Sequence, residues 1–229
     1  MGKEITALKE VLKRNKASFT NVVPTELTDE NVLKLDLSFD NKELIQLKSL
    51  SMQELNQYIQ QQLSLSNKKV AIGGYAENRV VYQMSEHFGS GEEARSVHLG
   101  IDIWCDAETP VFSPLDGIIH SFNNNDNFGD YGPTIILEHQ LENNSFYTLY
   151  GHLSTSSLNG IDIHQKVKKG QKIASIGNDN ENGNWPPHLH FQVMSDLMGK
   201  RGDFPGVCAI KEMDQWLNIC LDPGLILRM

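Results

Sequence analysis

Three short histidine motifs in a run of strand-like segments constrain this chain more than any other feature. Residues 98–102 read H-L-G-I-D, residues 150–153 read Y-G-H-L, and residues 186–193 read P-P-H-L-H-F-Q-V. Together they hold four of the eight histidines and one aspartate: His98, Asp102, His152, His188 and His190. A fold that accommodates this sequence must bring several polar rings to the face of an apolar sheet.

Short strands with turn signals between them are predicted from Ile101 to Val193. Residues 134–139 and 145–153 are predicted to be a pair of strands joined by a turn at Glu142-Asn-Asn. Residues 167–176 predict a further hairpin, with its turn at a Lys-Gly pair. The segment is therefore expected to be mainly β, with antiparallel strands.

The first 70 residues have a different pattern of apolar residues. Helical spacing of apolar residues predicts helices over residues 1–16 and 52–65, the second with Ser51 as its N-cap. Residues 33–37 alternate leucine with polar residues, which indicates a half-buried strand. From Val70 onward the chain becomes rich in Gly, Pro and Asn. We therefore place a boundary near residue 70.

Four segments follow from these changes of pattern. Residues 1–70 form an α/β extension, and residues 71–97 form a lead-in segment. Residues 98–195 form the main β-rich domain, and residues 196–229 form a C-terminal extension packed on its core. A short helix is predicted near residues 210–219 of this extension.

The last motif suits a strand with one face in the core. Side chains two residues apart on a strand point to the same side. His188 and His190 therefore share one face, while Leu189, Phe191 and Val193 share the other. The fold can bury the apolar face and leave the two imidazoles to line a site.

The other two motifs allow the same arrangement. His98 and Asp102 lie four residues apart, so they share a face on an extended strand or on one helical turn. Gly100 between them leaves room beside their side chains. On a strand over residues 145–153, His152 would share a face with Tyr150.

Several histidines on one face of a sheet are costly to bury, because each ring has two nitrogens that need partners. A metal ion removes this cost for at least two of them. A catalytic zinc is usually held by three protein ligands, with a fourth position open. The residue types in the three motifs are those of such a site.

Residues 95–195 resemble the lysostaphin-type (LytM-like) zinc metallopeptidases, peptidase family M23. The pattern of that family is H-x-x-x-D, then a G-H-L strand, then H-x-H. The flanking text T-P-V-F-S-P-L-D-G and Y-G-H-L-S is similar as well. The resemblance implies an antiparallel β-sandwich of the duplicated hybrid motif, with a metal at the floor of a groove.

Position by position, the resemblance implies that His98, Asp102 and His190 are the ligands of a Zn²⁺ ion, and that His152 and His188 are catalytic. Zinc would lower the pKa of its water toward ~7 and polarise the scissile carbonyl. His152 or His188 would assist proton transfer and stabilise the oxyanion. Their spacing does not assign the general base to either one.

The implied function is that of a zinc metalloendopeptidase acting on peptide bonds of the peptidoglycan cross-link type. Two alternatives remain. One is a metal-binding, non-hydrolytic module for peptide recognition or regulation, and the other is a hydrolase of a small cytosolic peptide. Both catalytic histidines are present, which favours hydrolysis over binding alone.

The lead-in segment could also regulate the site. In members of this family an upstream segment can occupy the groove, with an asparagine completing the coordination of the metal. Asn78 is the nearest candidate before His98. An autoinhibitory lead-in is therefore a hypothesis beside that of a packed extension.

Composition narrows the partners and the compartment. A net charge of −9 argues against a nucleic-acid partner. No run reaches the ~18 apolar residues of a membrane span. The first residues have no apolar stretch of signal-peptide length, so we expect a cytoplasmic protein; the alternative is export, with a signal missing from this sequence. Three widely spaced cysteines indicate neither a disulfide framework nor a thiolate zinc site.

Overall fold

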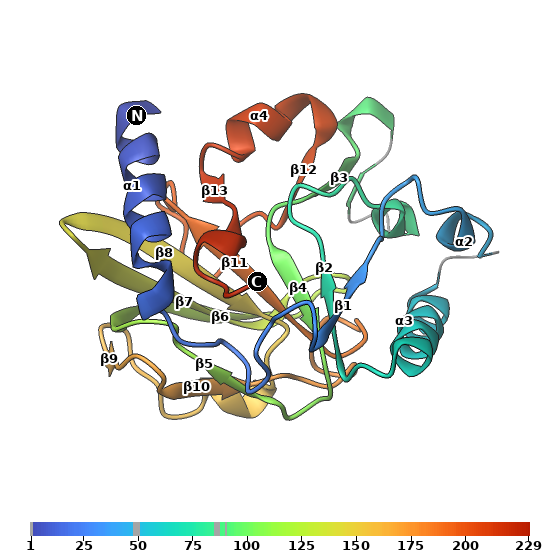
Figure 1. Ribbon diagram of the computed structural model, residues 1–229, viewed down its shortest axis with the longest axis horizontal. Coiled ribbons are helices and arrows are strands. Elements are labelled where there is room, and N and C mark those ends of the chain that lie inside the picture. Colours follow the sequence, from blue (N-terminus) through green and yellow to red (C-terminus); the bar gives the residue numbers. More distant parts are fainter. Residues whose placement is uncertain (1, 48–50, 85–87, 90) are drawn as a thin grey trace.

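A computed structural model describes the chain except for residues 1, 48–50, 85–87 and 90 (Figure 1). Its main sheet has the strand order β1-β2-β4-β11-β8-β7-β6-β9, and β13 pairs with the far end of β11. Two small sheets, β5–β10 and β3–β12, complete the strands of the described residues. The mainly β class with an α/β N-terminal extension is confirmed. The sandwich arrangement stays a prediction.

The strands are β1 (Val32–Leu35), β2 (Val70–Gly73), β3 (Arg95–His98), β4 (Ile101–Trp104), β5 (Pro110–Phe112), β6 (Gly117–Asn125), β7 (Gly132–Leu141), β8 (Asn144–Gly151), β9 (Lys166–Val167), β10 (Lys172–Ser175), β11 (His188–Met194), β12 (Val207–Ala209) and β13 (Cys220–Leu221). The α-helices are α1 (Gly2–Asn15), α2 (Lys42–Ile45), α3 (Met52–Ser66) and α4 (Met213–Trp216). In the described part of the chain, no helix is long and apolar enough to cross a bilayer.

The N-terminal extension and the start of the lead-in segment add two strands to the main sheet. β1 and β2 pair in parallel, and β2 then pairs antiparallel with β4. Helix α3 is capped by Ser51 in a capping box with Glu54, and it buries Leu55, Ile59 and Leu63. Both predicted helices of the extension are present, since α1 covers Gly2–Asn15.

Apolar side chains cover the main sheet on both faces. On one face, Val111 of β5 and Ala174 of β10 share a core with Phe191 of β11 and Leu12 of α1. The other face packs against Val97 of β3, among others. Because both faces are covered, the strands at the centre of the sheet are rigid supports for the side chains at their ends.

The predicted hairpin over residues 167–176 is wrong. β9 pairs with β6, and β10 pairs with β5, so the two strands join different sheets. The turn between them binds another loop: the Gly170 amide donates to the Ser113 carbonyl at 2.8 Å, and the Lys169 amide donates to Asp116 Oδ1 at 2.8 Å. These long-range bonds replace the local ladder that the turn residues suggested.

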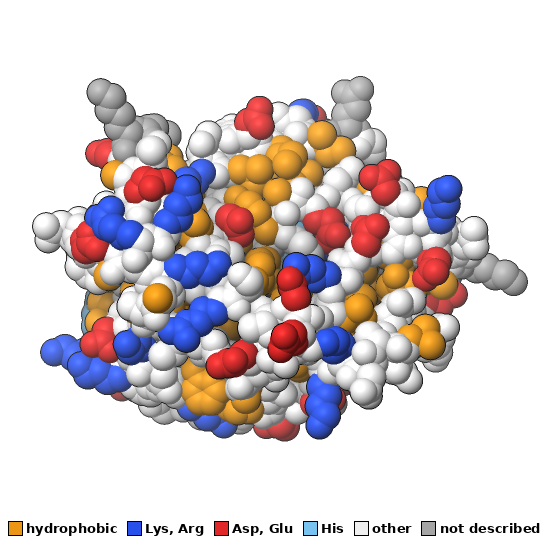
Figure 2. Space-filling view, in the orientation of Figure 1, with side chains coloured by type: hydrophobic (Ala, Val, Ile, Leu, Met, Phe, Trp, Pro, Cys, Tyr) orange, Lys and Arg blue, Asp and Glu red, His pale blue; other side chains and the backbone are white. Residues whose placement is uncertain are grey.

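The face in the orientation of Figure 1 carries acidic and basic side chains together, with many of the lysines and arginines on the side of α1 (Figure 2). Arg14 of α1, for example, is paired with Glu142 at the β7–β8 turn. Such a mixed surface is typical of a globular protein with a modest net charge.

Candidate metal centre

Strand β11 brings two of the predicted ligands next to each other. In the ladder with β4, His190 lies directly opposite Asp102, and in the ladder with β8 it lies opposite Gly151. Leu189, Phe191 and Val193 point into the core on the other face, as the alternation predicts. His190 and Asp102 are therefore neighbours across a strand pair, although 88 residues separate them.

His98 reaches the same point from a different sheet. It ends β3, and the link through Leu99 and Gly100 leads the chain directly into β4. A Cβ atom on Gly100 would lie 2.7 Å from the His190 ring, so a glycine is required where the two strands meet. His98 and Asp102 thus lie at a junction of two strands, on neither a single strand nor a helical turn.

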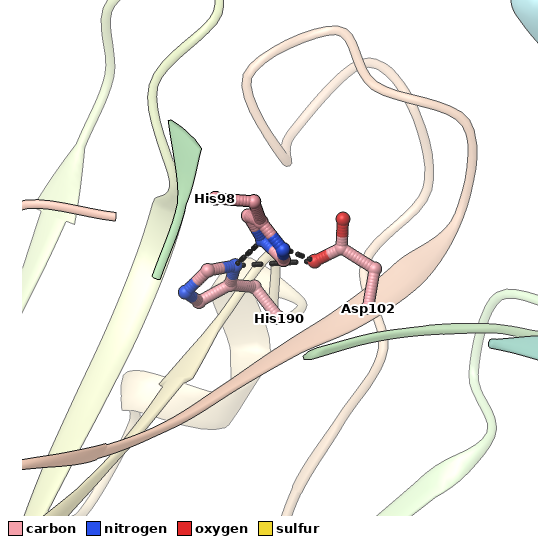
Figure 3. Close-up of side chains that lie close together, drawn as sticks. All are labelled: His98, Asp102 and His190. Carbon is pink, nitrogen blue, oxygen red and sulfur yellow. Dashed lines mark hydrogen bonds and ion pairs between the residues drawn. The ribbon is translucent and has the colours of Figure 1, made fainter. Parts of the chain in front are cut away.

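Three ligand atoms converge at this junction (Figure 3). His98 Nε2 lies 3.0 Å from His190 Nδ1 and 3.3 Å from Asp102 Oδ1, and His190 Nδ1 lies 3.1 Å from the same carboxylate oxygen. In tetrahedral zinc sites with bonds of about 2.0–2.2 Å, ligand atoms lie roughly 3.3–3.6 Å apart. The distances between these three atoms need to increase only slightly to accommodate a metal ion.

The outer nitrogen of each ligand ring is occupied by an acceptor. The His98 Nδ1–H donates to the Gly74 carbonyl at 2.9 Å, and the His190 Nε2–H donates to Gln192 Oε1 at 3.0 Å. The Gln192 amide is itself oriented, because its Nε2 donates to the Pro205 carbonyl at 3.2 Å. These bonds assign the protons to the outer nitrogens and leave the lone pairs of the inner nitrogens facing Asp102.

Three acceptor atoms therefore face one another with no proton assigned between them. The side chains of His98, Asp102 and His190 are all buried, with at most 3% of each residue exposed. A buried cluster of lone pairs is stabilised by a cation between them. We conclude that these residues fit a zinc ion by spacing, donor type and tautomer.

Burial keeps the site in the protonation state that a metal requires. Burial, together with the nearby Arg79 guanidinium, lowers the pKa of His98 to about 4. Burial alone would raise the pKa of Asp102, but His98 and Arg79 hold it well below its usual range. At neutral pH the carboxylate is ionised and the His98 ring is neutral, as metal ligation demands.

His188 and His152, the two predicted catalytic residues, lie beside this cluster with their ring centroids 4.1 Å apart. Each donates Nδ1–H to a main-chain carbonyl, His188 to Pro186 at 2.7 Å and His152 to Asn182 at 2.8 Å. Each Nε2 therefore carries the lone pair, and that of His188 lies 3.7 Å from Asp102 Oδ1. Burial lowers the pKa of His188 to about 4 and that of His152 well below its usual value.

The backbone conformation that places His152 at the site differs from the one that the strand pattern predicts. β8 ends at Gly151, so His152 is not on the strand and does not share the face of Tyr150, which is buried in the core. The backbone of His152 has φ +61°, in the left-handed region that non-glycine residues seldom adopt. This local conformation turns the ring toward His188, and its amide is held by the Tyr131 carbonyl at 2.8 Å.

The cavity over these residues has a volume of about 290 Å³. Its lining includes the imidazoles of His152, His188 and His190 and the aromatic side chains Tyr82, Phe88, Trp104, Tyr131, Trp185 and Phe204. Trp104 stacks on the His188 ring at a centroid distance of 4.1 Å. The two predicted catalytic histidines and His190 therefore line a hollow whose wall is largely aromatic.

Arg79 is the main residue at the site that sequence reasoning missed. It is only 1% exposed, and its Nη1 donates to Asp102 Oδ2 at 2.5 Å. It lies in the irregular lead-in segment, where neither strand nor helix periodicity points to a buried position. Only its pairing with Glu77, two residues earlier, is a local signal.

Asn78 does not line the cavity that contains the histidines. It forms a bridge with Val97 of β3 and lines a separate hollow with Phe39 and Arg95. The neighbouring residue, Arg79, reaches Asp102 instead. The structure therefore gives no support to Asn78 as a residue that occludes the metal centre.

Comparisons with known proteins agree with the motifs. Residues 96–202 match the model of Peptidase family M23. No curated protein matches the chain.

Several solved structures are similar to parts of the chain. A zinc-containing peptidase from Vibrio cholerae is 32% identical over 43% of this chain and 27% of its own, with a TM-score of 0.35. The catalytic domain of lysostaphin from Staphylococcus simulans is 24% identical over 58% of this chain and 81% of its own, with a TM-score of 0.40. Csd3 of Helicobacter pylori is 25% identical, with a TM-score of 0.34, and the match covers 54% of this chain and 32% of that protein. The chain thus spans about a quarter to a third of two of these proteins.

Proposed function

Because residues 96–202 match the model of Peptidase family M23, we propose that this chain is a zinc-dependent metalloendopeptidase that hydrolyses peptide bonds of the peptidoglycan cross-link type. The observation that carries the proposal is the convergence of His98 Nε2, Asp102 Oδ1 and His190 Nδ1, which all lie within 4.8 Å of one another. The outer nitrogens of both rings are already hydrogen-bonded, so these three acceptors are directed toward a cation.

His98, Asp102 and His190 would hold the zinc ion. When bound, zinc supplies a Lewis acid that polarises a peptide carbonyl and makes water nucleophilic at neutral pH. The contribution of the chain is a rigid ligand set on β3, β4 and β11. Its hydrogen bonds fix each ring in one tautomer before the metal arrives.

His152 and His188 would move protons. Both are neutral at pH 7 because burial lowers the pKa of each ring, and both present Nε2 as the acceptor. A neutral imidazole can take a proton from the attacking water and pass it to the leaving amine. Once protonated, it also stabilises the negative charge that develops on the carbonyl oxygen.

The shape of the cavity supports a second candidate substrate, a short soluble peptide. The volume of about 290 Å³ lies at the lower end of the roughly 300–1,000 Å³ that small-molecule sites have. His98, His152, His188 and His190 are each no more than 5% exposed. A cavity of this size has room for only a few residues, which suits a short peptide.

One experiment tests both the function and the choice of substrate. The purified chain is analysed for bound metal and then incubated with cell-wall sacculi and, separately, with a library of short peptides. We expect one zinc per chain and release of new amino groups from at least one substrate. The variants His190→Ala and His152→Ala serve as inactive controls. Bound zinc without cleavage of either substrate would contradict the proposed hydrolase and favour the binding module.

A further inference from the structure

Arg79 is among the largest fully buried side chains of the described residues, and one of its hydrogen-bond partners is the predicted ligand Asp102. Its Nε donates to Glu77 Oε2 at 2.7 Å, and its Nη2 donates to the Gly74 carbonyl at 3.2 Å. Its Nη1 donates to Asp102 Oδ2 at 2.5 Å and lies 3.4 Å from the Tyr82 hydroxyl. A buried guanidinium with this many partners has one fixed position.

The two oxygens of Asp102 are divided between Arg79 and the histidines. Oδ1 faces His98 Nε2 and His190 Nδ1, whereas Oδ2 is the acceptor for Arg79. Figure 3 shows this division, with one oxygen turned toward both rings and the other turned away. Carboxylates can bind a metal through one oxygen or through both, and only Oδ1 is available here.

Arg79 also acts on a second predicted ligand through a shared acceptor. The Gly74 carbonyl accepts from Arg79 Nη2 and from His98 Nδ1–H. A Cβ atom on Gly73 would lie 2.6 Å from Arg79 Nη2, so the chain passes close to the guanidinium at this point. One buried cation thus holds both Asp102 and the carbonyl that orients His98.

The N-terminal extension takes part through Glu77. While Oε2 of Glu77 pairs with Arg79, its Oε1 accepts from the Leu37 amide at 3.0 Å. The Glu77 carbonyl accepts from the His98 amide at 2.9 Å. The segment that carries Arg79 is therefore fixed both to the extension and to β3.

We propose that Arg79 is a positioning residue that restricts Asp102 to one metal-binding oxygen and holds it, with His98, in the ligating arrangement before metal binds. The proposal rests on the proposed function only in that the bound ion is zinc. Two effects of the guanidinium oppose each other. Its charge repels a metal ion, but its hydrogen bonds fix the ligands. Losing an outer hydrogen-bond partner of a metal ligand typically weakens metal binding about 10–100-fold, so the positioning effect dominates.

Substituting Arg79 in the full-length chain tests this role. Arg79→Met removes the hydrogen bonds and keeps much of the volume, and Arg79→Lys keeps the charge but cannot span from Asp102 to Glu77. The matched control is Arg14→Met, which removes another arginine–carboxylate pair, the exposed one with Glu142. Zinc affinity is measured by competition with a chromogenic chelator. Coordination is followed by the visible absorption of bound Co²⁺, which weakens when a fifth ligand joins four.

Zinc affinity is expected to fall about 10–100-fold in Arg79→Met and by a smaller factor in Arg79→Lys. The Co²⁺ absorption of Arg79→Met should weaken, because Asp102 Oδ2 is then free to bind as well. Arg14→Met should match the wild type in both measurements. Unchanged or tighter zinc binding by Arg79→Met, with an unchanged Co²⁺ spectrum, would overturn the proposal.

If Arg79→Met does not fold, Arg79→Lys decides: weaker zinc binding with an altered Co²⁺ spectrum supports the role, and wild-type values in both overturn it. A wild-type chain that binds no zinc would instead contradict the proposed function. The variants therefore test the role of Arg79, and zinc binding by the wild-type chain tests the proposed function.

Discussion

Zinc affinity is expected to fall by more than about 100-fold when His190 is replaced by alanine, because the loss of a ligand exceeds the loss of an outer hydrogen-bond partner. His190 is the centre of the cluster: its Nδ1 lies 3.0 Å from His98 Nε2 and 3.1 Å from Asp102 Oδ1. Peptide hydrolysis should disappear together with the metal. Metal analysis after dialysis and a zinc titration of the His190→Ala variant check the prediction.

His139→Ala is the matched control for His190→Ala. His139 is also a buried histidine of the main sheet, but it is bound to the Asp116 carbonyl at 2.9 Å and to Thr148 Oγ1 at 2.7 Å, away from the cavity. Its loss should lower the melting temperature and leave one zinc per chain. Equal loss of zinc in both variants would attribute the effect of His190→Ala to general destabilisation.

Replacing His152 with alanine should separate catalysis from metal binding. The ring stacks near His188, and no contact within hydrogen-bond distance joins it to His98 or Asp102 among the described residues. Zinc should stay bound, while kcat falls about 10²–10⁴-fold, which is the usual contribution of a general acid or base. Steady-state kinetics with a cleaved peptide and metal analysis of the same sample measure the two quantities together.

The exposed residue His164 provides the control for this second variant. His164→Ala should keep both its zinc and its kcat. If His152→Ala instead lost zinc in proportion to activity, His152 would have to be assigned to metal binding. Unchanged kcat with zinc bound would remove it from the catalytic mechanism.

The alternation of histidine and apolar residues was sufficient to predict which side chains of β11 are in the core. The H-x-H spacing put His188 and His190 on one face and Leu189 and Phe191 on the other, and the structure has the leucine and phenylalanine in the core. The helix α3 was equally predictable, since Ser51 and the apolar stripe behind it are local signals. In both cases the period of the element determines which side chains are buried.

The arrangement of elements around the site was not predictable in the same way. His190 lies opposite Asp102 only because β11 inserts between β4 and β8, and strand order depends on contacts that are distant in sequence. His152 was assigned to a strand face because its left-handed φ has no signature in the pattern. Arg79 was missed because its partner Asp102 is 23 residues away, in another element.

The turn at Lys169 and Gly170 shows the limit of local turn chemistry. Its residues are suited to a hairpin, and Gly170 does have a positive φ of 74°. Its amides nevertheless bond to Ser113 and Asp116, which direct β9 and β10 into separate sheets. Long-range hydrogen bonds thus decided which strands pair.

Anomalous scattering from crystals of the zinc-loaded chain, measured on both sides of the zinc absorption edge, locates the bound metal. We expect one strong anomalous peak per chain, lying between His98 Nε2, Asp102 Oδ1 and His190 Nδ1. We also expect the Arg79 guanidinium to stay on Asp102 Oδ2. A zinc peak elsewhere in the molecule, or no peak in crystals grown with zinc, would show that these three residues do not bind zinc.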